Sequence, residues 1–252
     1  MASYFPVWAL CIQISYGSPS LCAHFFILWL FQFSKQKQNF KSSFFTLTKL
    51  LTVFDIFYYV SLNLQSKLFF NPQLAQYFIN FDPGSFFYRI IMFGFYFFNY
   101  LRSFFVIAES MNRFAFVLYI DKQTDKFDAK MSKFIWPFLV VAVLIALSQS
   151  WFYFICLYVF IRFGDTDSLF LIARQTSYVT KGSLRSAIIG FICAISCIFL
   201  NGIAAVLLFR RKFAVKQRGG LNLFLIALTN FLFHLVQSVT EVRILYFALT
   251  QL

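Results

Sequence analysis

Two long apolar stretches of the sequence each contain a pair of opposite charges. Lys49 and Asp55 lie in the first stretch, and Arg102 and Glu109 lie in the second. A charge at the centre of a membrane helix costs roughly 2.5–3.5 kcal/mol on insertion scales, so each should face protein or water and have a partner. Ion pairs between helices and a path for ions or protons are the two kinds of chemistry that such residues can perform.

The depth of the four charges predicts how they pair. If the two stretches are antiparallel helices whose ends lie near residues 43 and 114, Lys49 is six residues deep and Glu109 five, whereas Asp55 and Arg102 are both twelve deep. We therefore expect one contact between Lys49 and Glu109 and another between Asp55 and Arg102. Lys49 and Asp55 are separated by ~120° around a helix, so the long lysine side chain must bridge that angle. The pairs either hold two helices together or take part in a conformational switch.

A second pattern lies at the end of the same helix, in the run Glu109-Ser110-Met111-Asn112-Arg113-Phe114. Glu109 stands four residues before Arg113, a spacing and an order that favour an ion pair on one helix face. An arginine at the inner end of a central helix faces either that carboxylate or an incoming partner.

The sequence contains no pattern for catalysis or for metal binding. His24 and His234 are single, and the five cysteines lie within apolar stretches without paired spacing. No nucleophile elbow, phosphate-binding glycine loop or HExxH is present, so we expect no enzyme activity, no metal and no cofactor. Four polar residues of the later stretches are more typical of hydrogen bonds between helices than of a cavity lining: Asn201, Asn230, His234 and Gln237.

The composition determines which elements position these residues. Hydrophobic residues make up 60% of the chain and charged residues 12%, against roughly 45–50% and about 25% in soluble domains. So much apolar surface needs the lipid bilayer as its solvent. The net charge of +13 lies in short clusters between apolar runs, which favours control of membrane topology over binding of nucleic acid.

Apolar runs of about 20 residues predict a single all-α domain over residues 1–252, a polytopic bundle of six clear transmembrane helices. The predicted spans are residues 7–33, 44–62, 86–117, 135–160, 186–209 and 221–242. Thirteen Lys and Arg residues fall on one side of these spans and seven on the other, so we expect the richer side to be cytoplasmic and the amino terminus to lie outside.

Three short motifs resemble the nematode serpentine chemoreceptors, most closely class gamma (Srg), with class V (Srv) as the near alternative. Tyr16-Gly17-Ser18-Pro19-Ser20 is similar to the family's tyrosine-then-Pro-Ser pattern in the first helix. Lys41-Ser42-Ser43-Phe44-Phe45 is similar to its entry to the second, and Asn112-Arg113 to its Asn-Arg signature at the base of the third. The chain departs from the family in having Ile120 where a proline is usual, in lacking a cysteine near the outer end of the third helix, and in ending at Leu252 without a clear seventh helix.

The resemblance implies a G-protein-coupled chemoreceptor in the plasma membrane of a sensory cell. Its partners would be an unknown small-molecule ligand, a heterotrimeric G protein and the lipid bilayer. The coupling surface would contain Asn112 and Arg113, with Arg210, Arg211 and Lys212 as further candidates, while the ligand-binding residues are unknown. The alternative is a small transporter or channel that uses the charges at Lys49, Asp55, Arg102 and Glu109.

Overall fold

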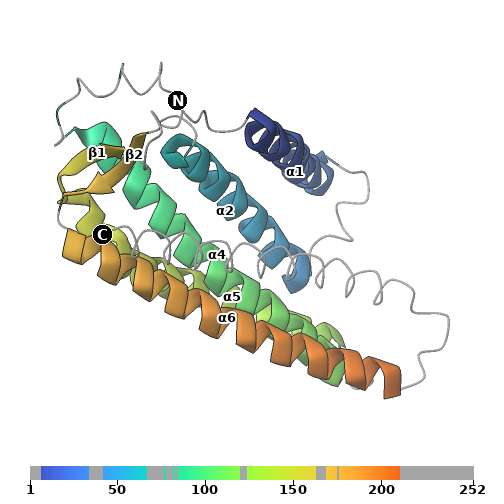
Figure 1. Ribbon diagram of the computed structural model, residues 1–252. Coiled ribbons are helices and arrows are strands. Elements are labelled where there is room, and N and C mark those ends of the chain that lie inside the picture. Colours follow the sequence, from blue (N-terminus) through green and yellow to red (C-terminus); the bar gives the residue numbers. More distant parts are fainter. Residues whose placement is uncertain are drawn as a thin grey trace. The chain divides into compact units, whose positions relative to one another are not determined.

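The computed structural model describes residues 7–33, 42–66, 77, 82, 85–119, 124–162, 169–174 and 176–210. Five α-helices account for most of them, and Figure 1 labels the elements. In chain order the elements are α1 (Val7–Phe33), α2 (Ser43–Ser66), α4 (Phe86–Tyr119), α5 (Thr124–Ser150), the 3-10 helix η2 (Trp151–Phe154), the strands β1 (Tyr158–Arg162) and β2 (Leu169–Ala173), and α6 (Thr176–Arg210).

Four segments of the described residues are long and apolar enough to cross a membrane, with mean hydropathies from 1.3 to 2.3. They are Ser43–Gln65, Phe86–Leu118, Asp128–Phe154 and Leu184–Leu207. Helices of this kind form because each satisfies its own backbone hydrogen bonds where no water is present. The prediction of an all-α, polytopic membrane protein is confirmed, while the sixth predicted span, 221–242, lies outside the described residues.

Helices α2 and α4 agree closely with the predicted spans. Helix α1 covers the predicted 7–33, but only the shorter apolar segment Leu21–Phe33 is found in it, so its crossing of the membrane stays a prediction. Helix α6 begins at Thr176, ten residues before the predicted span 186–209, and the fourth span differs most. Helix α5 begins at Thr124 and ends at Ser150, whereas the apolar run predicted a span over 135–160. The first turns of α5 are polar, so the search for apolar runs did not include them in the predicted span. At the other end, residues 158–160 belong to strand β1. Antiparallel β1 and β2 pair Tyr158 with Ala173 and Arg162 with Leu169, a short hairpin that the sequence did not predict.

The chain divides into two compact units, of which the first contains Met1–Lys35, Thr52–Asn99 and Leu144–Gly182. Aromatic rings fill its core. The rings of Tyr96 and Tyr153 stack with centroids 4.0 Å apart, and Tyr88 meets Phe160 of β1 edge-on at 5.6 Å. The hydroxyl of Tyr153 lies only 2.0 Å from where a Cβ on Gly182 would stand, so this position needs glycine.

The second unit contains Gln36–Leu51, Tyr100–Val143 and Ser183–Leu252. Leu47 of α2 and Phe105 of α4 are fully buried in it, and Phe105 meets Phe138 of α5 edge-on at 5.5 Å. Small residues of α6, such as Cys197 and Ala204, are fully buried. Small side chains let helices approach closely in a membrane, where packing takes over from the hydrophobic effect.

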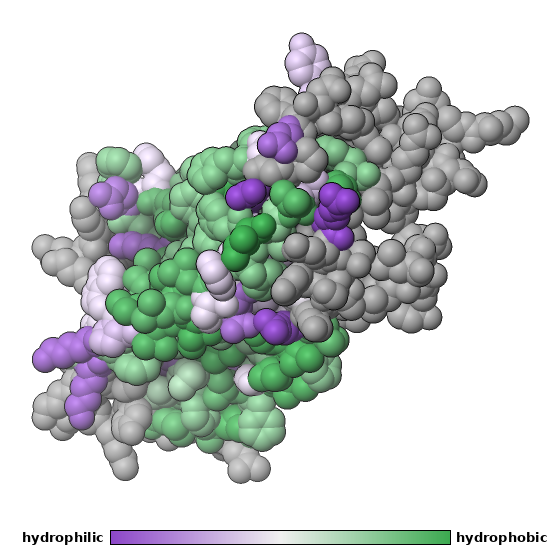
Figure 2. Space-filling model, turned by 90° about the vertical axis from the view of Figure 1, so that its left-hand side faces the viewer, coloured by the Kyte–Doolittle hydropathy of each residue, from purple (hydrophilic) through white to green (hydrophobic). Residues whose placement is uncertain are grey.

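Apolar side chains also dominate the described surface in the view of Figure 2. Large hydrophobic residues are exposed along α5 and α6, including Trp136, Leu144, Phe191 and Phe199. Exposed apolar surface on this scale is typical of helices whose solvent is lipid.

Candidate functional site

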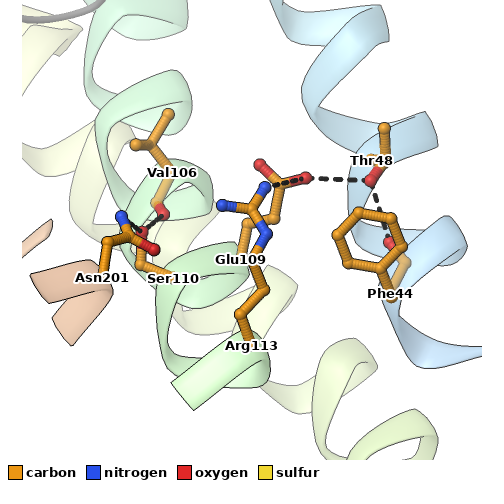
Figure 3. Close-up of polar contacts among 7 residues, drawn as sticks. All are labelled: Phe44, Thr48, Val106, Glu109, Ser110, Arg113 and Asn201. Carbon is orange, nitrogen blue, oxygen red and sulfur yellow. Dashed lines mark hydrogen bonds and ion pairs between the residues drawn. The ribbon is translucent and has the colours of Figure 1, made fainter. Parts of the chain in front are cut away.

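The Glu109 carboxylate is the centre of a buried polar cluster in the second unit. Its Oε1 lies 2.9 Å from Arg113 Nη2 one turn along α4, and it accepts a hydrogen bond of 2.9 Å from Thr48 Oγ1 of α2. Figure 3 shows the three side chains converging. Glu109 is 2% exposed and Arg113 is 8% exposed, so this pair is shielded from bulk solvent.

Thr48 has two acceptors for one hydroxyl proton. Its Oγ1 lies 3.0 Å from the Phe44 carbonyl oxygen, within its own helix, and 2.9 Å from Glu109. A hydroxyl donates one hydrogen bond at a time, and bonds to an ionised carboxylate are stronger than bonds to a neutral carbonyl. Thr48 therefore ties α2 to α4 through the Glu109 carboxylate, and the Phe44 carbonyl oxygen is a local alternative acceptor.

The Arg113 guanidinium has more donors than the described residues use. It lies over the Phe44 ring at 5.4 Å from the centroid, a cation–π contact. Its Nη2 contact with Glu109 is an ion pair without hydrogen-bond alignment, and its Nε makes no hydrogen bond to the described residues. Arginine carries five N–H donors, so Arg113 keeps capacity for further acceptors.

Asp128 of α5 caps the amino end of α2. Its Oδ1 accepts hydrogen bonds from the Ser43 backbone N–H at 2.8 Å and from the Ser43 hydroxyl at 2.6 Å. The first turn of a helix has unsatisfied N–H groups and partial positive charge, so a carboxylate is favourable there. This cap comes from another helix, 85 residues away in the chain.

Asn112 completes this end of the cluster. Its Oδ1 lies 3.3 Å from Ser43 Oγ, whose proton is directed at Asp128. A hydroxyl donates one hydrogen bond at a time, so the shorter bond to the Asp128 carboxylate is the stronger of the two. Asn112 is buried, so it faces the other helices of this unit.

The turn before Arg113 contacts α6. Asn201 Nδ2 donates a hydrogen bond of 3.2 Å to Ser110 Oγ, and Ser110 in turn donates to the Val106 carbonyl oxygen at 2.9 Å (Figure 3). The prediction that Asn201 takes part in a hydrogen bond between helices is confirmed. One end of α4 thus carries polar contacts to α2 and α6, while Ser43 links α2 to α5.

The predicted charge pairs have different outcomes. The pair of Glu109 with Arg113 is confirmed. The contact of Lys49 with Glu109 stays a prediction, since the described contacts of Glu109 are with Arg113 and Thr48. Asp55 and Arg102 fall in different compact units, and their contact also stays a prediction.

His24 contributes a contact that the sequence did not suggest. Its Nε2 lies 4.0 Å from Asp55 Oδ2 within the first unit. The sequence analysis compared the depths of charges in the second and third predicted spans only. It therefore did not consider His24, which lies in the first.

The remaining candidates lie at or beyond the end of α6. Arg210 is the last residue of that helix, and Arg211 and Lys212 lie outside the described residues. Among the residues that are described, no group of three His, Cys, Asp or Glu side chains has the geometry to hold a metal ion.

Long apolar helices, together with charges that are buried against polar partners, define a multi-pass helical membrane protein. A family model of the Srg family chemoreceptors matches residues 10–251. The chain belongs to this family, as its motifs indicated, and class gamma is thereby preferred to class V. No curated protein matches the sequence.

Proposed function

We propose that this chemoreceptor signals through a heterotrimeric G protein, and that release of Arg113 from Glu109 is the step that exposes the coupling surface. The observation that carries the proposal is the position of Arg113. It is buried against a carboxylate toward the end of α4, and it retains donors that the described residues do not use.

Burial of this pair makes it suited to a two-state device. Removing two charges from water costs several kcal/mol per ion, so a buried pair gives little net stability. A second helix arrangement in which Arg113 meets acceptors of a partner therefore need not lie far above the first in free energy. A ligand that prefers that arrangement shifts the population toward it.

The orientation that this function needs has Asn112 and Arg113 on the cytoplasmic side, with Arg210, Arg211 and Lys212 as further parts of the coupling surface. The excess of Lys and Arg on that side supports it. In this orientation the receptor stands in the plasma membrane of a sensory cell with its amino terminus outside, and an external small molecule is the stimulus.

The test uses signalling without added ligand, because the ligand is unidentified. The receptor is expressed with a promiscuous G-protein α subunit, and the second messenger is normalised to receptor at the cell surface. Glu109→Gln removes the charge that holds Arg113 but keeps the size of the side chain. We expect basal signalling to rise, by about tenfold for each ~1.4 kcal/mol lost from the resting state.

Two threonines of α2 supply a matched control. Thr48→Val removes the hydroxyl that binds Glu109 and should raise basal signalling in the same direction. Thr46→Val removes a hydroxyl whose described hydrogen bond is to the carbonyl oxygen of Ser42, just before α2, at 3.2 Å, and should leave signalling unchanged. Addition of Arg113→Ala to Glu109→Gln should abolish the gain, and a gain that persists would overturn the role of Arg113.

Transport is the competing function, because intramembrane charges such as Asp55 beside His24 also occur along proton paths. Purified protein in liposomes distinguishes the two functions. Proton or ion flux without any G protein, and lost on Asp55→Asn, would favour the transporter. We expect no flux above that of protein-free liposomes.

A further inference from the structure

Two lysines lie on the outer face of α5, at the point where its sequence changes from polar to apolar. Lys130 and Lys133 are both exposed. At 100° per residue, Lys133 lies ~60° from Lys130 around the helix and Phe134 ~40° on the other side, so the three share one face. Phe134 is 52% exposed.

The rest of that face is apolar and open. Val141, ~20° from Lys130 and also exposed, continues this face toward the helix centre, and Trp136, which is 61% exposed, borders it ~60° beyond Lys133. Of the four candidate spans of the described residues, the one in α5 is the least buried, at 17%. A spanning helix with an outer face of this kind contacts lipid chains, so the lysines lie at the level of the headgroups.

Trp136 gives independent support for placing the two lysines at the level of the lipid headgroups. Tryptophan prefers the boundary between headgroups and chains, and lysine near a helix end extends its ammonium group toward the headgroups. Trp136 follows Lys133 by one turn, which matches this order along the helix axis.

The nearest described acid of α5 does not neutralise the two lysines. Asp128 directs Oδ1 at the backbone and hydroxyl of Ser43, at 2.8 and 2.6 Å, and is held against α2. Among the described contacts, neither ammonium group is paired with this carboxylate, so both can meet a partner outside the chain.

We propose that Lys130 and Lys133, with the exposed ring of Trp136 next to Lys133, form a binding site for the phosphate of an anionic phospholipid headgroup. Lysine acts toward phosphate as a compact charge with three donors, and two lysines one turn apart can contact the oxygens of one headgroup. The acyl chains then lie along Phe134 and Val141. The site is independent of the proposed signalling function and of the orientation in the membrane.

A soluble acidic protein is the other partner that two lysines could attract. The apolar side chains on the same face favour lipid, because a soluble partner cannot cover residues that continue into the hydrocarbon region. The proposal therefore commits to a membrane lipid.

Trp136 makes the site measurable. Trp8, Trp29 and Trp151 are the other tryptophans, and replacing all three with Phe leaves Trp136 as the single fluorophore. This variant is placed in lipid nanodiscs that contain brominated phosphatidylglycerol or, at the same mole fraction, brominated phosphatidylcholine. Bromine quenches tryptophan only at short range, so the ratio of the two quenching strengths reports the local preference for anionic lipid.

We expect phosphatidylglycerol to quench Trp136 more strongly, since each lysine near an anionic lipid favours it by roughly fivefold at low salt. Lys130→Gln with Lys133→Gln should bring the ratio to about that of bulk lipid, whereas Lys130→Arg with Lys133→Arg should preserve it. Arg185→Gln, which removes an exposed charge from α6, is the control and should change nothing. A ratio that is equal for the two lipids, or one that survives loss of both lysines, would overturn the proposal.

Discussion

Glu109 Oε1 lies 2.9 Å from Arg113 Nη2, and both side chains are almost fully buried at one end of α4. The contact joins two residues on successive turns of the same helix, so it restrains the rotamer of Arg113 without fixing one helix against another. The link to α2 comes instead from Thr48 and from the Phe44 ring. Arg113 is thus held by its own helix and covered by a neighbour, an arrangement that a small movement of α2 can open.

The first prediction concerns the stability of this pair. Arg113→Met alone leaves the Glu109 carboxylate buried without its countercharge, which typically costs about 3–5 kcal/mol. Glu109→Leu with Arg113→Met removes both charges and should cost far less. Thermal denaturation of the purified variants in detergent measures the difference. Equal losses for the single and double variants would show that the pair is not buried as described.

The second prediction concerns the cap on α2. Ser43→Ala removes only the hydroxyl bond and should destabilise the protein by about 1.5–3 kcal/mol, the range for a hydrogen bond to a charged group, while Asp128→Ala removes the backbone bond as well and should cost more. The double variant should lose less than the sum of the two, because both changes remove the hydroxyl bond. Strict additivity in thermal denaturation would mean that the two residues do not interact.

Glycines of α6 supply the third prediction, with its own control. A Cβ at Gly182 would stand 2.0 Å from the Tyr153 hydroxyl and 3.2 Å from Phe152, so Gly182→Ala should destabilise the protein. A Cβ at Gly202 meets nothing within 4 Å, and Gly202→Ala should gain up to about 1 kcal/mol from helix propensity.

Tyr153→Phe separates the causes of a loss at Gly182. It removes the nearest atom and should recover part of the stability in the Gly182→Ala background. Midpoints of thermal denaturation report all three variants. Similar effects of alanine at positions 182 and 202 would contradict the close approach of Tyr153.

The fourth prediction is a dependence on alkaline pH. Tyr158 of β1 donates a hydrogen bond of 2.5 Å to the Tyr153 carbonyl oxygen, and burial raises the pKa of its phenol well above the usual 10. The folded state therefore favours the neutral phenol. Its contribution is fully present below about pH 10, the pKa in the unfolded chain, and is lost as the pH rises toward the folded pKa.

Tyr158→Phe tests whether the phenol of Tyr158 causes this loss of stability at alkaline pH. The variant should be less stable than the wild type at neutral pH, by about 1 kcal/mol for the lost hydrogen bond. The gap should narrow above pH 10, because only the wild type must then keep a phenol protonated. A gap that stays constant from pH 8 to pH 11 would mean that Tyr158 is not the titrating group.

Local patterns were sufficient for part of this structure. The spans of α2, α4 and α6 follow from apolar length, since the backbone in a membrane has few alternatives to the helix. The pair of Glu109 with Arg113 follows from a four-residue spacing on one helix. In both cases the information lies within a single element.

Contacts between different helices could not be predicted from local sequence patterns. Asp128 reaches Ser43 across 85 residues, and neither its position in α5 nor its rotation about the helix axis follows from composition. Depth alone paired Asp55 with a residue of α4, while His24 of α1 lies 4.0 Å away. Strand β1 was not predicted, for a different reason. Tyr158 to Ile161 continues an apolar run, and short apolar runs do not distinguish a strand from the end of a buried helix.

The side of the membrane that Arg113 faces is the central point, because a G protein can reach it only from the cytoplasm. An epitope at the amino terminus, probed with antibody on intact and on permeabilised cells whose surface receptor is verified by biotinylation, measures it most directly. We predict labelling of intact cells, which places the amino terminus outside and the Arg113 end of α4, three crossings later, inside. Labelling only after permeabilisation, with the receptor at the surface, would place Arg113 outside and contradict coupling through this site.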